Sequence, residues 1–278
     1  MSSNISFVIF TYNEESRISY VIRNFIKYGK VLIMDDGSTD KTKEICDALG
    51  ADYYIRPKVD KPFIENSEIF DFIKQVVHTD WIYWGYADNL APKKLLDELE
   101  KVSQQEKVKY VNIPLYTYLW GSIDNFSSKA YSPMFFRKDF ISFDNNGMHG
   151  MGKFLGCEDE ILKLLDRPEY ALRHYSVYDV NSFIRKHLSY ADSEAKSNYI
   201  NGKKFSFIRM VLAMIRYFFD YYRYGYRNGV SGFITAFSYV CFRFMAHARL
   251  YEIENSITTA SIEEQYAKSK EELLKEFI

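Results

Sequence analysis

The sequence has little cysteine. Only Cys46, Cys157 and Cys241 occur in 278 residues, far apart and with no CxxC pair. Three separated thiols exclude a dense disulfide framework and a cysteine zinc site, and they suit a reducing cytosol.

An excess of charge of one sign is also missing, because the chain has 36 Lys and Arg residues and 37 Asp and Glu residues, for a net charge of −1. This balance argues against a general nucleic-acid binder.

Long hydrophobic runs are absent as well. The longest uncharged run near the C-terminus covers 228–242, or 15 residues. A spanning helix needs about 18–20 apolar residues, so we expect no transmembrane helix. The first residues show no basic stretch followed by an apolar one, and Ser2 stands where myristoylation needs glycine. We therefore expect neither a secretory signal nor an N-terminal lipid anchor.

Aromatic residues are abundant, with 24 Tyr, 22 Phe and 3 Trp making 18% of the chain. They can serve an aromatic core, or a surface that meets sugars or a membrane interface, and composition does not choose between these uses. The hydrophobic share of 47% and the charged share of 26% are those of an ordinary folded protein.

Strand and helix patterns alternate through the first hundred residues. The apolar or alternating runs that predict strands are 5–12, 30–34, 51–55 and 80–86, and the helical spacings between and after them cover 16–28, 40–49, 64–77 and a helix opened by Pro92. This order predicts an α/β fold with a mostly parallel sheet and helices on both faces. Further strands are expected within 110–140 and 171–177, a long loop at 144–160, and mainly helices from about 179 onwards.

Ligands of parallel sheets bind beyond the carboxyl ends of the strands, so the residues at those ends carry the functional argument. The first strand ends in Thr11-Tyr12-Asn13-Glu14. A ring at this place can stack on a nucleobase while a hydroxyl or an amide holds its edge. The alternative is a plain strand-to-helix turn in which Asn13 bonds local backbone.

Two further strand ends carry carboxylates. Asp35 and Asp36 follow the second strand, and because adjacent carboxylates repel each other, one of them could accept a hydrogen bond from a base or a ribose. The alternative is a glycine turn with helix capping. Asp88 follows the strand at 80–86 and is a natural ligand for Mg²⁺ or Mn²⁺, or else an early cap for the helix at Pro92.

Together, the three motifs resemble the family 2 glycosyltransferases of the GT-A fold, a Rossmann-like α/β architecture. The resemblance is carried by 7–15, 31–42 and 80–89 and covers about residues 4–100. Later segments are similar to a branch of lipopolysaccharide-core and capsule glucosyltransferases, through His174-Tyr175-Ser176, 183–195 and the turn at 228–232.

The resemblance implies a role for each matching position. Thr11 and Tyr12 would hold and stack the nucleobase, usually uracil, and Asp36 would hydrogen-bond its edge. Asp88 would match the last Asp of the DxD motif and bind Mg²⁺ or Mn²⁺ across the diphosphate, and His174 could add a metal or phosphate contact, although a lone histidine is more often structural. The implied donor-binding set is Thr11, Tyr12, Asn13, Glu14, Asp35, Asp36 and Asp88.

Two positions depart from the family pattern. Tyr86 stands where many members have the first Asp of the DxD motif, and His149-Gly150 stands where some relatives have a His-Glu pair. The catalytic base of the family is usually an Asp or Glu beyond the acceptor loop. The candidates here are Glu158, Asp159 and Glu160, with Asp159 preferred, and the alternative is the acidic first turn of a helix.

A basic, aromatic segment follows. Eight cations and one acid lie within 203–249, and Arg209, Arg216 and Arg223 recur every seven residues. Such helices suit the surface of an anionic membrane. The alternatives are helices packed on the catalytic domain with solvated or paired arginines, or RNA binding, for which no motif is present. We expect a GT-A domain over 1–200 and a helical, membrane-associated module over 201–278.

These observations predict an inverting glycosyltransferase at the inner face of the cell membrane. It would move a sugar from a nucleotide donor to a lipid-linked, lipopolysaccharide-type or capsule-type acceptor, with no nucleic acid as partner and with homo-oligomers possible. One alternative is a scaffold that kept the fold and lost the chemistry, which the two departures motivate. A sugar-phosphate nucleotidyltransferase is the other, and the missing N-terminal glycine-rich phosphate loop disfavours it.

Overall fold

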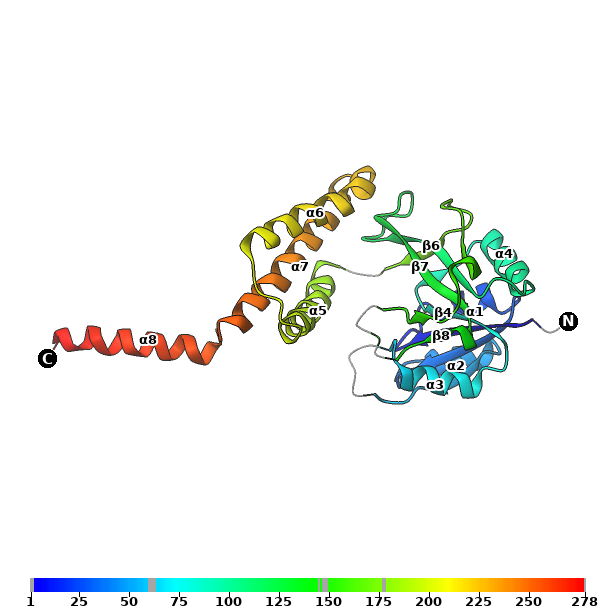
Figure 1. The fold of residues 1–278 in the computed structure, drawn as a ribbon, viewed down its shortest axis with the longest axis horizontal. Coiled ribbons are helices and arrows are strands. Elements are labelled where there is room, and N and C mark those ends of the chain that lie inside the picture. Colours follow the sequence, from blue (N-terminus) through cyan, green and yellow to red (C-terminus); the bar gives the residue numbers. More distant parts are fainter. Residues whose placement is uncertain (1–2, 60–63, 145, 147–149, 177–178, 278) are drawn as a thin grey trace. The chain divides into compact units, whose positions relative to one another are not determined.

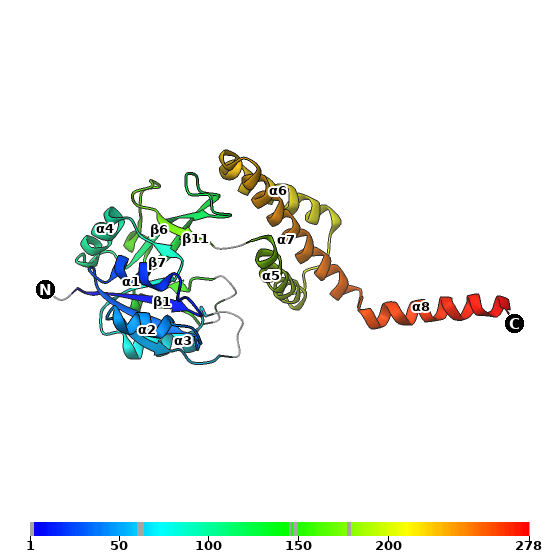
Figure 2. The same ribbon diagram turned by 180° about the vertical axis from the view of Figure 1, so that it is seen from behind.

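The computed structural model describes residues 3–59, 64–144, 146, 150–176 and 179–277. The chain divides into two compact units (Figures 1 and 2). The first unit comprises Met1–Tyr118 and Lys129–Ser176, and the second comprises Leu119–Ser128 and Val177–Ile278. Each unit is described by itself below.

A mixed β-sheet forms the centre of the first unit. Its strands are β1 (Ile5–Thr11), β2 (Lys30–Asp35), β3 (Asp52–Ile55), β4 (Trp81–Tyr86), β5 (Asn89–Leu90), β6 (Tyr110–Tyr118), β7 (Ser128–Arg137), β10 (Ile161–Lys163) and β11 (Leu172–Tyr175). Their order is β3-β2-β1-β4-β7-β6-β11-β5, with β10 beside β6. Strands β3, β2, β1 and β4 run parallel, whereas β7 is antiparallel to β4 and β5 is antiparallel to β11. The α/β fold predicted from the sequence is therefore confirmed, with antiparallel additions.

Alternation along β1 divides the core between the two faces of the sheet. All seven β1 residues are buried, and Phe7 and Ile9 belong to one apolar cluster while Val8 and Phe10 belong to another. Helices α1 (Ile18–Phe25), α2 (Thr42–Ala48) and α4 (Lys93–Ser103) contribute to the first cluster, and α3 (Ser67–Val76) contributes to the second. Helices thus cover both faces, as the alternation of strand and helix patterns predicts.

A small hairpin lies against the face that α3 covers. It consists of the turn η1 (Lys138–Phe140), β8 (Ile141–Ser142) and β9 (Lys153–Phe154), and the turn η2 (Glu158–Glu160) follows it. Phe143, one residue after β8, stacks on Trp84 of β4 with ring centroids 4.8 Å apart. This contact fixes the path of the chain as it leaves β8.

Helices make up most of the second unit: α5 (Val180–Ile200), α6 (Phe207–Gly225), the turn η3 (Tyr226–Asn228), α7 (Val230–Glu254), α8 (Thr259–Leu274) and the turn η4 (Lys275–Phe277). Helices α5 and α6 both pack on α7. Helix α5 therefore groups with the C-terminal helices, and the compact units divide near residue 176, whereas the domain boundary predicted from the sequence lies at residue 200.

Two ion pairs join α5 to α7. Arg243 makes a two-pronged pair with Glu194 at 2.8 and 2.9 Å, and Arg249 reaches Asp192 at 3.0 Å. These two arginines therefore link α5 to α7 in addition to the packing of the helices. Helix α8 contributes no buried side chain. Within the part of the chain that the structure describes, no helix combines the length and the apolarity needed to cross a membrane.

Candidate active site

The ends of the central strands meet at one edge of the sheet. Thr11 pairs with Asp35 between β1 and β2, and Phe10 pairs with Tyr86 between β1 and β4. The three motifs singled out in the sequence therefore lie side by side, because they follow adjacent parallel strands. This edge is the place where parallel α/β sheets bind ligands.

Asp35 organises the loop that follows β2. Its buried carboxylate accepts hydrogen bonds from the Thr11 hydroxyl at 2.9 Å, from the Gly37 amide at 2.7 Å and from the Ser38 amide and hydroxyl, each at 2.5 Å. Burial alone would raise the pKa of Asp35, but hydrogen bonds from Ser38, Tyr53 and Thr11 outweigh it and hold the pKa below its ordinary value. Asp35 and Thr11 thus stabilise the loops at this edge of the sheet, since the Asp35 carboxylate and the Thr11 hydroxyl are hydrogen-bonded within the protein.

The loop after β1 is fastened to the loop after β2. The Asn13 amide donates to the Ser38 hydroxyl, its side-chain oxygen accepts from the Thr39 amide, both at 2.8 Å, and its φ of 54° lies in the left-handed region that asparagine tolerates. The Glu14 amide donates to the Thr42 hydroxyl of α2 at 2.8 Å, and the Glu14 carboxylate pairs with Arg17 at 2.6 Å. Asn13 therefore joins two loops that are far apart in the sequence, whereas the turn interpretation given above has it bonding local backbone.

Tyr12 is exposed at the end of β1, and Asp36 is half-buried at the end of β2. The Tyr12 side chain is 57% exposed. The half-buried Asp36 carboxylate pairs with Arg56 at 2.8 Å and with Lys58 at 2.7 Å. The repulsion expected between two adjacent carboxylates is thus removed, because Asp35 is held by neutral donors and Asp36 by two cations.

Asp88 and His174 are brought together by strand pairing. Asn89 of β5 lies opposite His174 of β11, and the Tyr175 amide donates to the Asp88 carbonyl at 2.9 Å. The His174 Nε2 and the Asp88 Oδ2 are 3.0 Å apart. Burial would raise the pKa of Asp88, but the hydrogen bond and charge of His174, with the charge of Arg17, lower it below its usual value. Asp88 is therefore held as a carboxylate.

The other oxygen of this carboxylate suits a hard cation. Asp88 Oδ1 is buried and has no hydrogen-bond partner within the described structure. Mg²⁺ is typically bound by one or two carboxylates together with substrate phosphates and water, so one orphaned carboxylate oxygen fits such an ion when a diphosphate supplies further ligands. Over residues 3–277, apart from the gaps given above, no three His, Cys, Asp or Glu side chains gather into a metal cluster of their own.

Tyr86, the last residue of β4, binds a carboxylate from another part of the chain. Its hydroxyl donates to Glu65 Oε1 at 2.5 Å. Burial, followed by the charge of Glu65, raises the pKa of Tyr86. Sequence reasoning missed Glu65, because a single carboxylate ahead of a helix carries no signal of the strand end that it meets.

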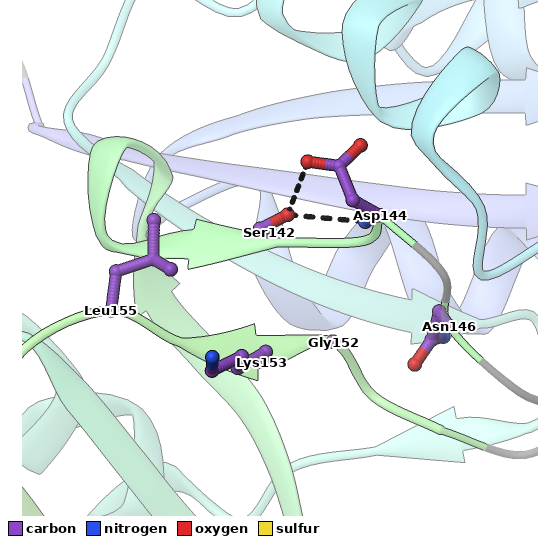
Figure 3. Close-up of a pocket in the computed structure, with 6 residues that line it drawn as sticks. All are labelled: Ser142, Asp144, Asn146, Gly152, Lys153 and Leu155. Atoms are coloured by element: carbon purple, nitrogen blue, oxygen red, sulfur yellow. Dashed lines mark hydrogen bonds between the residues drawn. The ribbon is translucent and has the colours of Figure 1, made fainter.

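A hollow of about 520 Å³ lies beside the β8–β9 hairpin, and Figure 3 shows the residues that line it: Ser142, Asp144, Asn146, Gly152, Lys153 and Leu155. The Ser142 hydroxyl donates to the exposed Asp144 carboxylate at 2.7 Å. The Asn146 amide group donates to the Glu65 carbonyl at 2.8 Å, which links the hollow to the residue that Tyr86 binds. Sequence reasoning missed Asp144 as well.

The predicted base residues lie elsewhere. Glu158, Asp159 and Glu160 form the turn η2 ahead of β10, and β10 pairs with the first residues of β6. His174, in contrast, pairs with Thr117 near the last residues of β6. Seven residue steps separate Tyr110, opposite Ile161, from Thr117, opposite His174, and they correspond to about 23 Å, so the structure does not bring these carboxylates together with Asp88.

The contacts of the η2 turn are structural. Asp159 pairs with Lys107 at 3.1 Å, and the Glu160 carboxylate accepts a hydrogen bond from the Cys157 amide at 2.8 Å. Acidic residues thus occupy the first turn of a short helix, which is the alternative stated above. His149 lies outside the described residues, and Gly150 offers no carboxylate.

Comparison with known proteins gives consistent matches. Residues 6–165 match the model of a family described as Glycosyl transferase family 2. An uncharacterized glycosyltransferase of Rickettsia bellii is 28% identical over 265 residues, covering 91% of this chain and 88% of that protein. A second, from Rickettsia conorii, is 27% identical and covers 91% of each chain. The solved structure of the mannosyltransferase PcManGT from Pyrobaculum calidifontis, in complex with GDP-Man and Mn²⁺, has a TM-score of 0.44 at 10% identity, covering 98% of this chain and 81% of that chain.

Proposed function

This chain belongs to glycosyl transferase family 2 and is a glycosyltransferase, and from that premise we propose that it transfers a sugar, with inversion, from a UDP-sugar to a hydroxyl of a lipid-linked or polysaccharide-type acceptor. The observation that carries the proposal is the Asp88–His174 pair with its unpartnered carboxylate oxygen, next to the strand ends that bear Tyr12 and Asp36. The choice of uracil and of the acceptor class rests on the sequence resemblance.

The donor would lie across the carboxyl edge of β1, β2 and β4. The exposed Tyr12 ring stacks on the base, and Asp36, which Arg56 and Lys58 hold in place, accepts a hydrogen bond from the edge of the base. The diphosphate then reaches the Asp88 carboxylate, which His174 orients. Mg²⁺ or Mn²⁺ held there would offset the negative charge of the departing diphosphate.

An inverting transfer also needs a base on the acceptor side. The acceptor oxygen bonds to the anomeric carbon as the bond to the diphosphate breaks, and the hydroxyl proton must go to a carboxylate. We assign this role to Asp144, because it lines the hollow linked through Asn146 to Glu65, and Glu65 is bound by Tyr86 at the end of β4. The acidic turn η2 lies toward the opposite end of β6.

Two isosteric variants separate the two assignments of the base. Asp144→Asn should lower kcat for transfer by roughly 10²–10⁴-fold, the usual contribution of a general base, with donor affinity unchanged. Asp159→Asn is the matched control and should retain wild-type turnover. Loss of turnover in Asp159→Asn but not in Asp144→Asn would return the role to the acidic turn.

The transfer itself is tested by release of nucleoside diphosphate. Purified protein would receive UDP-, GDP- and dTDP-sugars with Mn²⁺ and a bacterial lipid extract as acceptor source. We expect release from one nucleotide class, and its absence in Asp88→Ala.

Tyr86 in place of a carboxylate favours a second candidate, a non-catalytic donor-binding scaffold. Donor binding that is insensitive to Asp88→Ala, with no turnover, would support the scaffold instead.

A further inference from the structure

Helix α6 presents an apolar stripe to solvent. Ile208, Leu212, Ile215 and Phe219 are spaced 4, 3 and 4 residues apart, so they lie on one side of the helix, and each is 50–70% exposed. Tyr217 and Tyr221, on the opposite side of α6, contact Arg243 and Tyr239 of α7. Large apolar side chains in an unbroken exposed row are unusual on a surface that meets only water.

Helix α7 continues the same surface. Val230, Phe233 and Phe237 are each at least 50% exposed. Phe218 of α6 contacts both Phe219 and Phe233, with ring centroids 5.5 and 6.0 Å apart, and Phe233 stacks on Phe237 at 6.0 Å. These ring contacts join the two rows into one patch. We name it the α6–α7 apolar face and define it as Ile208, Leu212, Ile215, Phe219, Val230, Phe233 and Phe237.

A row of arginines borders this face. Arg209, Arg216 and Arg223 are exposed and lie on one flank of the α6 stripe, since Arg209 and Arg216 each follow a stripe residue. Arg216 and Arg223 share one acid, Asp220, at 3.9 and 3.6 Å. These are long contacts in water, and such surface pairs contribute little free energy. The guanidinium groups of Arg216 and Arg223 thus remain accessible to another anion. The exposed Arg209 guanidinium donates one hydrogen bond to the Lys204 carbonyl at 2.7 Å and retains further donors.

We propose that the α6–α7 apolar face and its arginine row bind the surface of an anionic lipid bilayer, with both helices lying in the interfacial plane. An apolar stripe beside a row of cations is the pattern of helices that insert shallowly at the headgroup level, where arginines contact lipid phosphates. A second copy docking through the same face would bring its own arginine row, and Asp220 is the one acid within 203–249. The inference depends neither on the donor nor on the acceptor.

The test is co-sedimentation of the full chain with vesicles. We expect binding to phosphatidylcholine vesicles that contain about a third phosphatidylglycerol, weaker binding to pure phosphatidylcholine, and release as salt rises. Arg209→Gln/Arg216→Gln/Arg223→Gln should lower the partition coefficient about a hundredfold, because each basic residue near such a surface contributes about a factor of five. Leu212→Ser/Phe219→Ser should lower it at least tenfold.

Matched controls lie on other helices of the same unit. Lys268→Gln/Lys270→Gln/Lys275→Gln removes the same net charge from α8 and the η4 turn that follows it, and Leu188→Ser/Ile200→Ser removes exposed apolar side chains from α5. Both should bind as the wild type does. Circular dichroism of every variant checks that the helices persist.

Three results would overturn the proposal. The first is failure of the folded wild type to bind anionic vesicles, and the second is equal loss of binding in the α8 charge control and the arginine variant. The third is a dimer in sedimentation velocity that Leu212→Ser/Phe219→Ser abolishes while vesicle binding persists, because that would identify a second copy as the occupant of the face. Donor binding, measured in parallel, reports on the transfer function separately.

Discussion

Two glycines face each other where α6 meets α7, and they should respond to alanine in opposite ways. A Cβ atom on Gly232 would lie 1.8 Å from the Gly225 carbonyl oxygen and 2.5 Å from its carbon. These are backbone atoms, so no side-chain rotation relieves the overlap. A Cβ atom on Gly225 would meet nothing closer than 3.4 Å, which is ordinary contact.

The magnitudes follow from two opposing effects. Replacing a helical glycine by alanine gains up to about 1 kcal/mol of helix propensity at either position. Forcing an extra carbon into a packed contact costs about 1–3 kcal/mol, and a clash with backbone belongs at the upper end of that range. We therefore expect Gly232→Ala to lower the free energy of unfolding by about 2 kcal/mol, and Gly225→Ala to leave it unchanged or raise it by up to about 1 kcal/mol.

Thermal unfolding followed by circular dichroism at 222 nm measures both variants. Each kcal/mol corresponds to a shift in Tm of several degrees for a domain of about 100 residues. Gly232→Ala should therefore melt clearly below the wild type and Gly225→Ala at or above it. Equal shifts in the two variants, or a stable Gly232→Ala protein, would refute the close approach of the helices at this crossing.

Three further predictions follow from buried groups. Because the pKa of Asp35 is lowered in the folded protein, its carboxylate stabilises the fold fully at neutral pH, and this stabilisation is lost as the pH falls below the ordinary pKa of 3.8. Asp35→Asn should therefore lower the free energy of unfolding by roughly 1–3 kcal/mol at pH 7, and urea unfolding repeated across pH should show this difference shrinking in acid. Burial, then nearby carboxylates, raises the pKa of the Cys46 thiol to about 12. At pH 8 a thiol reagent should therefore modify the exposed Cys157 of the native protein and spare Cys46 until urea is added, whereas fast reaction of Cys46 would contradict its burial. Arg243→Ala should lower the free energy of unfolding by about 1–3 kcal/mol, because it leaves the Glu194 carboxylate without its partner. A double-mutant cycle tests this, and a Glu194→Ala effect that is as large in the Arg243→Ala background as in the wild type would show that the pair is not coupled.

The sequence predicts the site best where strand direction alone determines position. Adjacent parallel strands bring Thr11, Asp35 and Asp88 to one edge, and the family resemblance supplies His174 as their neighbour. The structure brings Asp88 and His174 to 3.0 Å although 86 residues separate them. Strand pairing accounts for this proximity, and the donor and metal roles of the two residues stay predictions.

The positions of residues in loops and short turns could not be predicted from the sequence. The acidic residues 158–160 resemble a catalytic cluster, but their location depends on β10 pairing with the start of β6, which no pattern in the sequence reveals. Glu65 and Asp144 escaped notice because each is a single carboxylate in a loop. Asp35 matched a donor-binding motif, yet its carboxylate accepts hydrogen bonds from its own loop and from Thr11.

The central claim is that a nucleotide-sugar donor and a divalent cation bind together at Asp88. The most direct measurement is a thermal-shift screen of UDP-, GDP- and dTDP-sugars with and without Mn²⁺, since a ligand at 100 times its Kd adds about 2.7 kcal/mol to the stability of the folded state. We predict a Mn²⁺-dependent rise in Tm with one nucleotide class that Asp88→Ala abolishes and Asp159→Ala retains. A cooperative melt that no donor shifts, or a shift that Asp88→Ala leaves intact, would contradict the claim.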